Sequence, residues 1–163
     1  MRTQADTYSA TVPAGEPAPV IPSLASFYDW SRDISWLLIR LTAGGILLVH
    51  GIIKIIGPGA AGVAGLFAHL GIEPAILFAW IVVLNETIGA VCIILGLFTR
   101  FFAASIAIEL AVVTLLVSYP HGFAFSAQGG GYEYPLMWGL LVFAIALRGG
   151  GPYSVDRAIG KEL

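Results

Sequence analysis

The stretch LLIRLTAGGILLVHGIIKIIG, residues 37–57, decides the fold class of this chain. It is long and apolar enough for a helix that crosses a bilayer, which takes about 20 residues. The whole chain agrees, because 58% of its residues are hydrophobic and only 11% are charged, against about 25% charged in a soluble domain. Yet the stretch holds Arg40, His50 and Lys54, which lipid alone would not accommodate. The sequence therefore predicts a membrane protein with polar groups directed into its interior.

The expected fold is all-α, an integral membrane four-helix bundle within residues 34–148. Its spans are predicted at about residues 35–56, 74–97, 101–119 and 132–147, where apolar runs are long enough.

The segments outside the spans have their own composition. Prolines and small residues, then alternating aromatic and charged residues, make residues 1–33 a mobile N-terminal tail with an interfacial collar. Apolar residues recur at helical spacing within 57–74, so a short interfacial helix is expected in this first outer loop. Residues 149–163 form a C-terminal tail. Most basic residues lie near the two ends of the chain or at Arg100, which predicts that both termini are cytoplasmic.

One face of the first span combines small and cationic residues. Helical spacing places Arg40, Gly44, Leu47, Gly51 and Lys54 on a single stripe. Glycines on such a stripe allow a second helix to approach closely. The stripe is therefore expected to face the other helices.

Carboxyl groups on the other spans provide partners for these cations. Glu86 and Glu109 fall near the middle of the second and third spans, where an ionised group needs a counter-charge. Arg40 has the alternative of reaching the inner headgroups. Matched by depth, the expected pairs are Lys54 with Glu133, His50 with Glu86, and Arg40 with Glu109.

These polar residues have two interpretations. They could form a functional site, because intramembrane ionisable groups usually mark ligand, ion or proton pathways. They could instead only fix the register of the helices, although buried ion pairs add little stability. In the first interpretation Glu86 relays protons, Arg40 and Glu109 belong to a buried charge network, and the ligand-binding residues are His50, Lys54, Glu133, Tyr132 and Tyr134.

Several kinds of site are disfavoured. A membrane haem needs two facing histidines, and His50 is the only histidine well inside a span. No cluster has the spacing of a metal site, and no flavin site is predicted. Cys92 is the single cysteine, so no internal disulfide can form, and a net charge of −2 argues against nucleic acid as a partner.

Five segments in order, RLTAGGILLVHGIIKIIG, HLGIEP, ETIGAVCIILGLFTRFFA, GGGYEYPLMWGLLV and GGGPYSVD, resemble the DoxX family over residues 37–157. The resemblance implies a four-helix bundle in the cytoplasmic membrane of a bacterium or archaeon. Some members of that family are membrane subunits of a thiosulfate:quinone oxidoreductase. The family pattern is matched at Arg40, Gly51, Lys54, Glu86, Gly96, Arg100, Glu133 and Ser154-x-Asp156.

Three functions remain open at this point. The first is a membrane subunit that binds a quinone or similar ligand and works with a redox partner, as part of an oxidoreductase. The second is a non-catalytic scaffold or anchor of a larger membrane complex. The third is a proton-coupled exporter of small molecules. In each case the partners are the bilayer and other protein subunits, including further copies of this chain.

Overall fold

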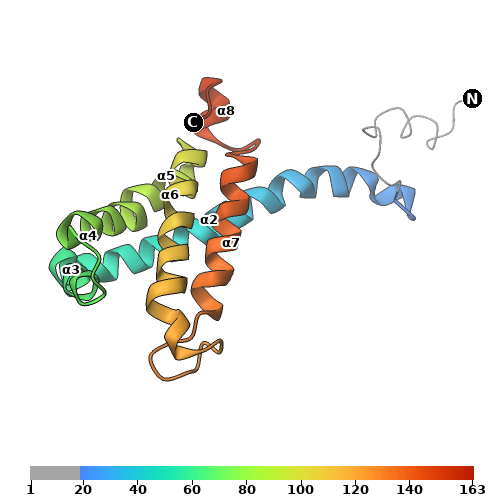
Figure 1. The fold of residues 1–163 in the computed structure, drawn as a ribbon. Helices are drawn as coiled ribbons and strands as arrows, with labels where there is room; N and C mark the ends of the chain where they lie inside the picture. Colours follow the sequence, from blue (N-terminus) through green and yellow to red (C-terminus); the bar gives the residue numbers. More distant parts are fainter. Residues whose placement is uncertain (1–18) are drawn as a thin grey trace, which may run out of the picture. The chain divides into compact units, whose positions relative to one another are not determined.

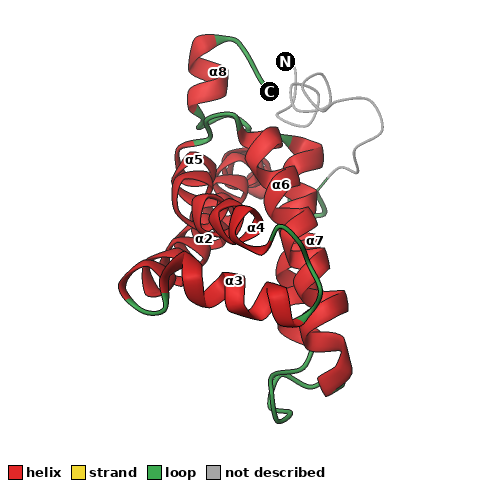
Figure 2. Cartoon of the chain, turned by 60° about the vertical axis from the view of Figure 1, so that its left-hand side comes forward, coloured by secondary structure: helices red, strands yellow, loops and turns green. Residues whose placement is uncertain are grey.

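The computed structural model describes residues 19–163, and every regular element in that range is helical (Figure 2). The chain divides into two units, residues 1–36 and 37–163; the polar residues of interest all lie in the second. The α-helices are α2 (Ala25–Ile56), α3 (Gly59–His69), α4 (Ala75–Leu84), α5 (Ala90–Leu95), α6 (Thr99–Val112), α7 (Glu133–Arg148) and α8 (Val155–Ile159).

Three continuous helical stretches among the described residues are long and apolar enough to cross a membrane: Pro22–Ile56, Ala75–Leu95 and Thr99–His121. The predicted all-helical membrane fold is thereby confirmed. The fourth expected span corresponds to α7, whose 16 residues cover about 24 Å at the rise of an α-helix. That length is below the roughly 30 Å of a hydrocarbon core, so a full fourth crossing stays a prediction.

The segments expected at the two ends of the chain differ in what the structure shows. Residues 1–18 of the predicted tail lie outside the described residues. The collar residues from Ala25 onward form the first turns of α2. Residues 149–163 fold back on the bundle, where the Phe101 amide donates to the Leu163 carbonyl over 3.0 Å.

The short helix expected in the first outer loop is α3, whose inner side packs against α4. Phe67 is buried in a cluster with Ala75 and Val82, while Leu66 remains exposed. The apolar side of α3 is therefore used partly for contact within the protein.

The small residues on the α2 stripe allow a neighbouring helix to approach closely, as the sequence predicts. A Cβ atom on Gly44 would stand 2.8 Å from the Ala90 carbonyl oxygen, and one on Gly51 would collide with the Glu86 carbonyl. The two helix backbones therefore touch at these glycines, because any larger side chain would separate them. Arg40 and Leu47, on the same stripe, are buried.

Two π-helical segments interrupt the spans. The first, η2, covers Asn85–Gly89 and joins α4 to α5; the second, η3, covers Val113–Ser118 and continues α6. A π turn widens the helix by one residue and is often found at functional sites. The neighbours Asn85 and Glu86, both in η2, are buried.

Helices α6 and α7 run side by side as an antiparallel pair (Figures 1 and 2). At the end of the pair formed by Thr99 and Arg148, the C-terminal segment closes over them through Asp156, which is 3% exposed. Its carboxylate accepts hydrogen bonds from the Phe98 amide at 2.8 Å, the Thr99 amide at 3.0 Å and the Thr99 hydroxyl at 2.6 Å. Asp156 thus satisfies donors at the start of α6.

Arg40 belongs to this C-terminal closure and not to a pair with Glu109, so the predicted Arg40–Glu109 pair is wrong. Its guanidinium donates to the Gly150 carbonyl and, over 2.6 Å, to the Tyr153 carbonyl. The physical reason is that a buried cation needs hydrogen-bond acceptors, and the backbone carbonyls of the C-terminal segment can fill this role in place of a carboxylate. Arg100 similarly donates to the Ala146 carbonyl over 3.0 Å at the end of α7.

Candidate functional site

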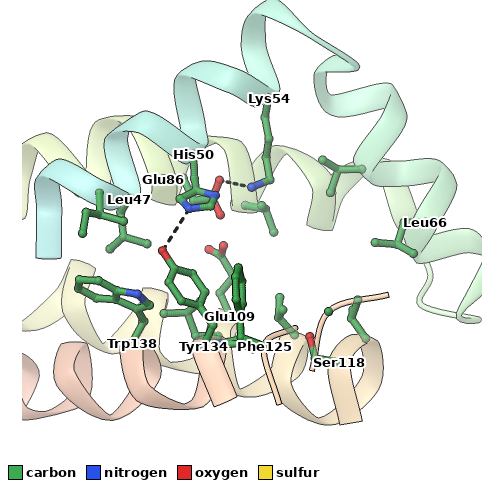
Figure 3. A pocket seen from close by; sticks show the side chains of 18 of the residues that line it. Leu47, His50, Lys54, Leu66, Glu86, Glu109, Ser118, Phe125, Tyr134 and Trp138 are labelled. Carbon is green, nitrogen blue, oxygen red and sulfur yellow. Dashed lines mark hydrogen bonds and ion pairs between the residues drawn. The ribbon is translucent and has the colours of Figure 1, made fainter. Parts of the chain in front are cut away.

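A cavity of about 330 Å³ lies among α2, α3, α6 and α7, with η2 and η3 at its wall. Most of its lining is apolar, including Leu47, Leu110 and Val113 (Figure 3). Both π-helical segments contribute to it. The polar side chains that converge on it are His50, Lys54, Glu86, Glu109, Ser118 and Tyr134.

Lys54 and Glu86 form an ion pair across the contact between α2 and η2. The Glu86 side chain is 8% exposed and that of Lys54 is 26% exposed. The predicted pairs of Lys54 with Glu133 and of His50 with Glu86 are therefore wrong. The close approach of the two backbones at Gly51 brings η2 within reach of Lys54. The flexible Lys54 side chain therefore pairs with Glu86, the nearer carboxylate.

His50 faces α7 instead. Its Nε2 atom lies 3.4 Å from the Tyr134 hydroxyl, and the ring centroids are 6.2 Å apart. A separation of 3.4 Å is long for a hydrogen bond, so the contact holds the two rings loosely. Both side chains point into the cavity (Figure 3).

Glu109 supplies a second carboxyl group to the cavity. It is 8% exposed and accepts a hydrogen bond of 2.9 Å from the Asn85 amide. The Asn85 oxygen in turn accepts from the Ser105 hydroxyl over 3.0 Å. Glu109 also interacts electrostatically with Glu86 and Lys54. One cation thus faces two carboxyl groups.

Glu133 and Tyr132 lie outside the cavity lining and organise the loop beside it. The Glu133 carboxylate accepts from the Phe125 amide at 3.1 Å, and the Glu133 amide donates to the Phe123 carbonyl at 3.0 Å. These bonds set Phe125 against Tyr134, with ring centroids 5.6 Å apart. Tyr132 stacks on Tyr119 at 5.4 Å. Their direct role in ligand binding stays a prediction.

Trp138 also lines the cavity and is 8% exposed. Its indole nitrogen has no hydrogen-bond partner within the described part of the chain. The indole N–H can only donate, and a buried donor without an acceptor is costly. Figure 3 shows the ring beside Leu47, with its nitrogen on the side toward Tyr134.

Sequence reasoning missed Asn85 and Trp138 for different reasons. Asn85 directly precedes Glu86 and points to a different helix, since it bonds Glu109 and Ser105 of α6 while Glu86 pairs with Lys54 of α2; the sequence gives no sign of this partner. Trp138 lies four residues after Tyr134, so the two share a helix face. That signal was available in the sequence.

Groups of three or more His, Cys, Asp and Glu side chains with the geometry of a metal site are not found between residues 19 and 163. Comparison with family models matches residues 35–119 to the model described as DoxX. No curated protein and no solved structure matches the chain. The matched range runs from within α2 to just past η3, and so contains Lys54, Glu86 and Glu109.

Proposed function

Because this chain belongs to the DoxX family, we propose that it is a membrane subunit that binds a quinone or similar ligand in the cavity and works with a redox partner protein. The supporting observation is the cavity itself: an apolar chamber into which His50, Lys54, Glu86 and Tyr134 all project. Ligand sites typically combine apolar walls with a few convergent polar groups. The volume of about 330 Å³ lies at the small end of the usual range of about 300–1,000 Å³, as a single ring system requires.

The polar groups have separate roles in this proposal. His50, Lys54 and Tyr134 present donors to the carbonyl groups of the ligand. Glu86, already joined to Lys54, relays protons, and Glu109 is the second carboxyl group beside it. With one cation and two carboxyl groups, this cluster is neutral when it holds one proton. Neutrality is favoured at this depth because an uncompensated charge is costly there.

Reduction of a quinone to the hydroquinone takes two electrons and two protons. The electrons come from the redox partner protein, and the protons pass through Glu86 one at a time.

The proposed location is the cytoplasmic membrane, with both termini cytoplasmic. Thr99 begins α6 and Arg148 ends α7, so Arg100, Arg148 and the C-terminal basic residues belong to the same end of this helix pair. The positive-inside rule makes that end cytoplasmic.

The function is tested by binding of decylubiquinone to the full-length protein in lipid nanodiscs, measured by titration calorimetry. Saturable binding is expected, and Lys54→Met should weaken it about tenfold, as expected for loss of a charged donor. Lys161→Met makes the same change at an exposed position near the C-terminus and should leave the affinity unchanged. Absence of saturable binding to the folded protein would refute the proposal.

A scaffold function has support of its own. A separate groove of about 430 Å³ runs along α6 and α7, and its lining includes the small residues Ala104, Ala107, Ala111 and Gly139. Small residues of this kind line helix contacts in membranes. If the protein bound no quinone but assembled with other subunits through this groove, that result would favour the scaffold function.

A further inference from the structure

Trp138 is the lining residue whose hydrogen-bonding capacity is unused. Lys54 is paired with Glu86, and Glu109 is bonded to Asn85. By contrast, the Trp138 indole nitrogen finds no acceptor among residues 19–163, although the side chain is 8% exposed. Natural proteins seldom bury a donor in this way. An acceptor from outside the chain would explain why the indole is retained here.

We propose that Trp138 Nε1 donates a hydrogen bond to the ligand, and that the ligand is a neutral, apolar ring molecule with an oxygen acceptor at its edge. This inference rests on the proposed function and deepens it, because it names the ligand class and a specificity-determining residue. Trp138 lies in α7, outside the range of the family match.

The acceptor requirement follows from the chemistry of the indole. An indole N–H donates and cannot accept, so a hydroxyl or amine that only donates would leave it unpaired. A carbonyl or ether oxygen satisfies it.

The neutral charge follows from the carboxyl groups. Glu86 and Glu109 both line the cavity, and Lys54 is the cation that faces them. A carboxylate or phosphate on the ligand would add an uncompensated negative charge to a cluster that is neutral when it holds one proton. A neutral ligand is therefore favoured over an anionic one.

The ring shape follows from the remaining walls. Leu47 and Tyr134 flank Trp138 in Figure 3, and the Tyr134 and Trp138 rings meet edge to face with centroids 6.0 Å apart. Aromatic surfaces in this arrangement favour a further flat ring.

Two flat bicyclic ligands of similar size, one with carbonyl oxygens and one without, test the inference. One is 2,3-dimethyl-1,4-naphthoquinone, whose substituted ring cannot add a thiol such as Cys92, and the other is 2,3-dimethylnaphthalene. Affinities are measured for the full-length protein in nanodiscs. We expect the wild type to bind the quinone at least tenfold more tightly than the hydrocarbon, because the Trp138 N–H and the other donors of the cavity can hydrogen-bond only to the quinone.

The substitution Trp138→Phe should reduce quinone affinity about tenfold and leave hydrocarbon affinity within twofold. Trp80→Phe is the matched control, because Trp80 is 52% exposed and should affect neither ligand. If Trp138→Phe folds poorly, β-(3-benzothienyl)alanine at position 138 keeps the bicyclic shape and removes the N–H.

The outcomes separate the two proposals. If neither ligand binds to the folded wild type, the proposed function fails and this inference fails with it. If the quinone binds but the loss of the N–H changes nothing, or both ligands bind equally, the cavity function stands and the role of Trp138 is overturned.

Discussion

Lys54 of α2 pairs with Glu86 of η2, while Glu133 at the start of α7 accepts a hydrogen bond from the backbone amide of Phe125. Lys54, the cation of the first span, is thus neutralised by a carboxylate of η2, the segment whose backbone touches α2 at Gly51. The Glu133 carboxylate, at the N-terminal end of α7, instead bonds the neighbouring loop.

The Lys54–Glu86 pair gives the first prediction. Glu86→Gln and Lys54→Met should each destabilise the protein, because each strands its partner. The cost should approach the roughly 3 kcal/mol of a broken buried pair for Lys54→Met, since Glu86 is 8% exposed. Unfolding in detergent, monitored by circular dichroism, measures both variants.

The double variant should recover part of the loss, giving a clear interaction energy in the double-mutant cycle. The combination of Lys54→Met with Glu133→Gln is the control and should be additive. Additivity for Lys54 and Glu86 would contradict the pair.

The second prediction concerns the contact of α2 with η2. Gly51→Ala should destabilise the protein by about 1–3 kcal/mol, the usual cost of overpacking, because the added Cβ would collide with the Glu86 carbonyl. Gly45→Ala is the matched control, since its Cβ would meet nothing within 4 Å. It should be neutral or stabilising by up to about 1 kcal/mol through helix propensity. Equal effects in thermal unfolding would argue against the close approach.

The third prediction concerns the C-terminal closure. Asp156→Ala removes the acceptor of three hydrogen bonds from Phe98 and Thr99. The expected loss is about 2–4 kcal/mol, since buried donors are left unpaired. Asp29, whose side chain is 57% exposed, provides a control, and Asp29→Ala should change the melting temperature little. A stable Asp156→Ala variant would show that the C-terminal segment is dispensable.

The fourth prediction is topological. With Cys92 replaced by Ala, single cysteines at Ala61 and Ser126 should react with a membrane-impermeant maleimide in intact cells. Ala158→Cys should react only after permeabilisation, because the basic end is expected inside. All three positions are exposed in the structure. The reverse labelling pattern would invert the orientation.

The helical membrane fold and the inward-facing stripe of α2 could be predicted from the sequence, because both follow from the period of apolar and small residues. Gly51 and Lys54 lie where that period puts them. The pairing of the charges could not be predicted in the same way. Matching by depth assumes regular helices with parallel axes, and a π turn at Asn85–Gly89 violates that assumption.

The partners of Arg40 show a second limit. Gly150 and Tyr153 lie more than a hundred residues away in the chain, and they use backbone carbonyls, which every residue has. No side-chain pattern could mark them. The nearby Ser154-x-Asp156 motif showed only that this segment has a defined structure.

The carbonyl partners of Arg40 impose an order on assembly. The oxygens that receive the guanidinium of the first span, at Gly150 and Tyr153, follow α7 in the chain. An unpaired arginine within a membrane costs about 2.5–3.5 kcal/mol even on the lenient insertion scale. Arg40 therefore gains these partners only once residues 150–153 have joined the bundle, and a chain cut before Gly150 would leave its guanidinium without them.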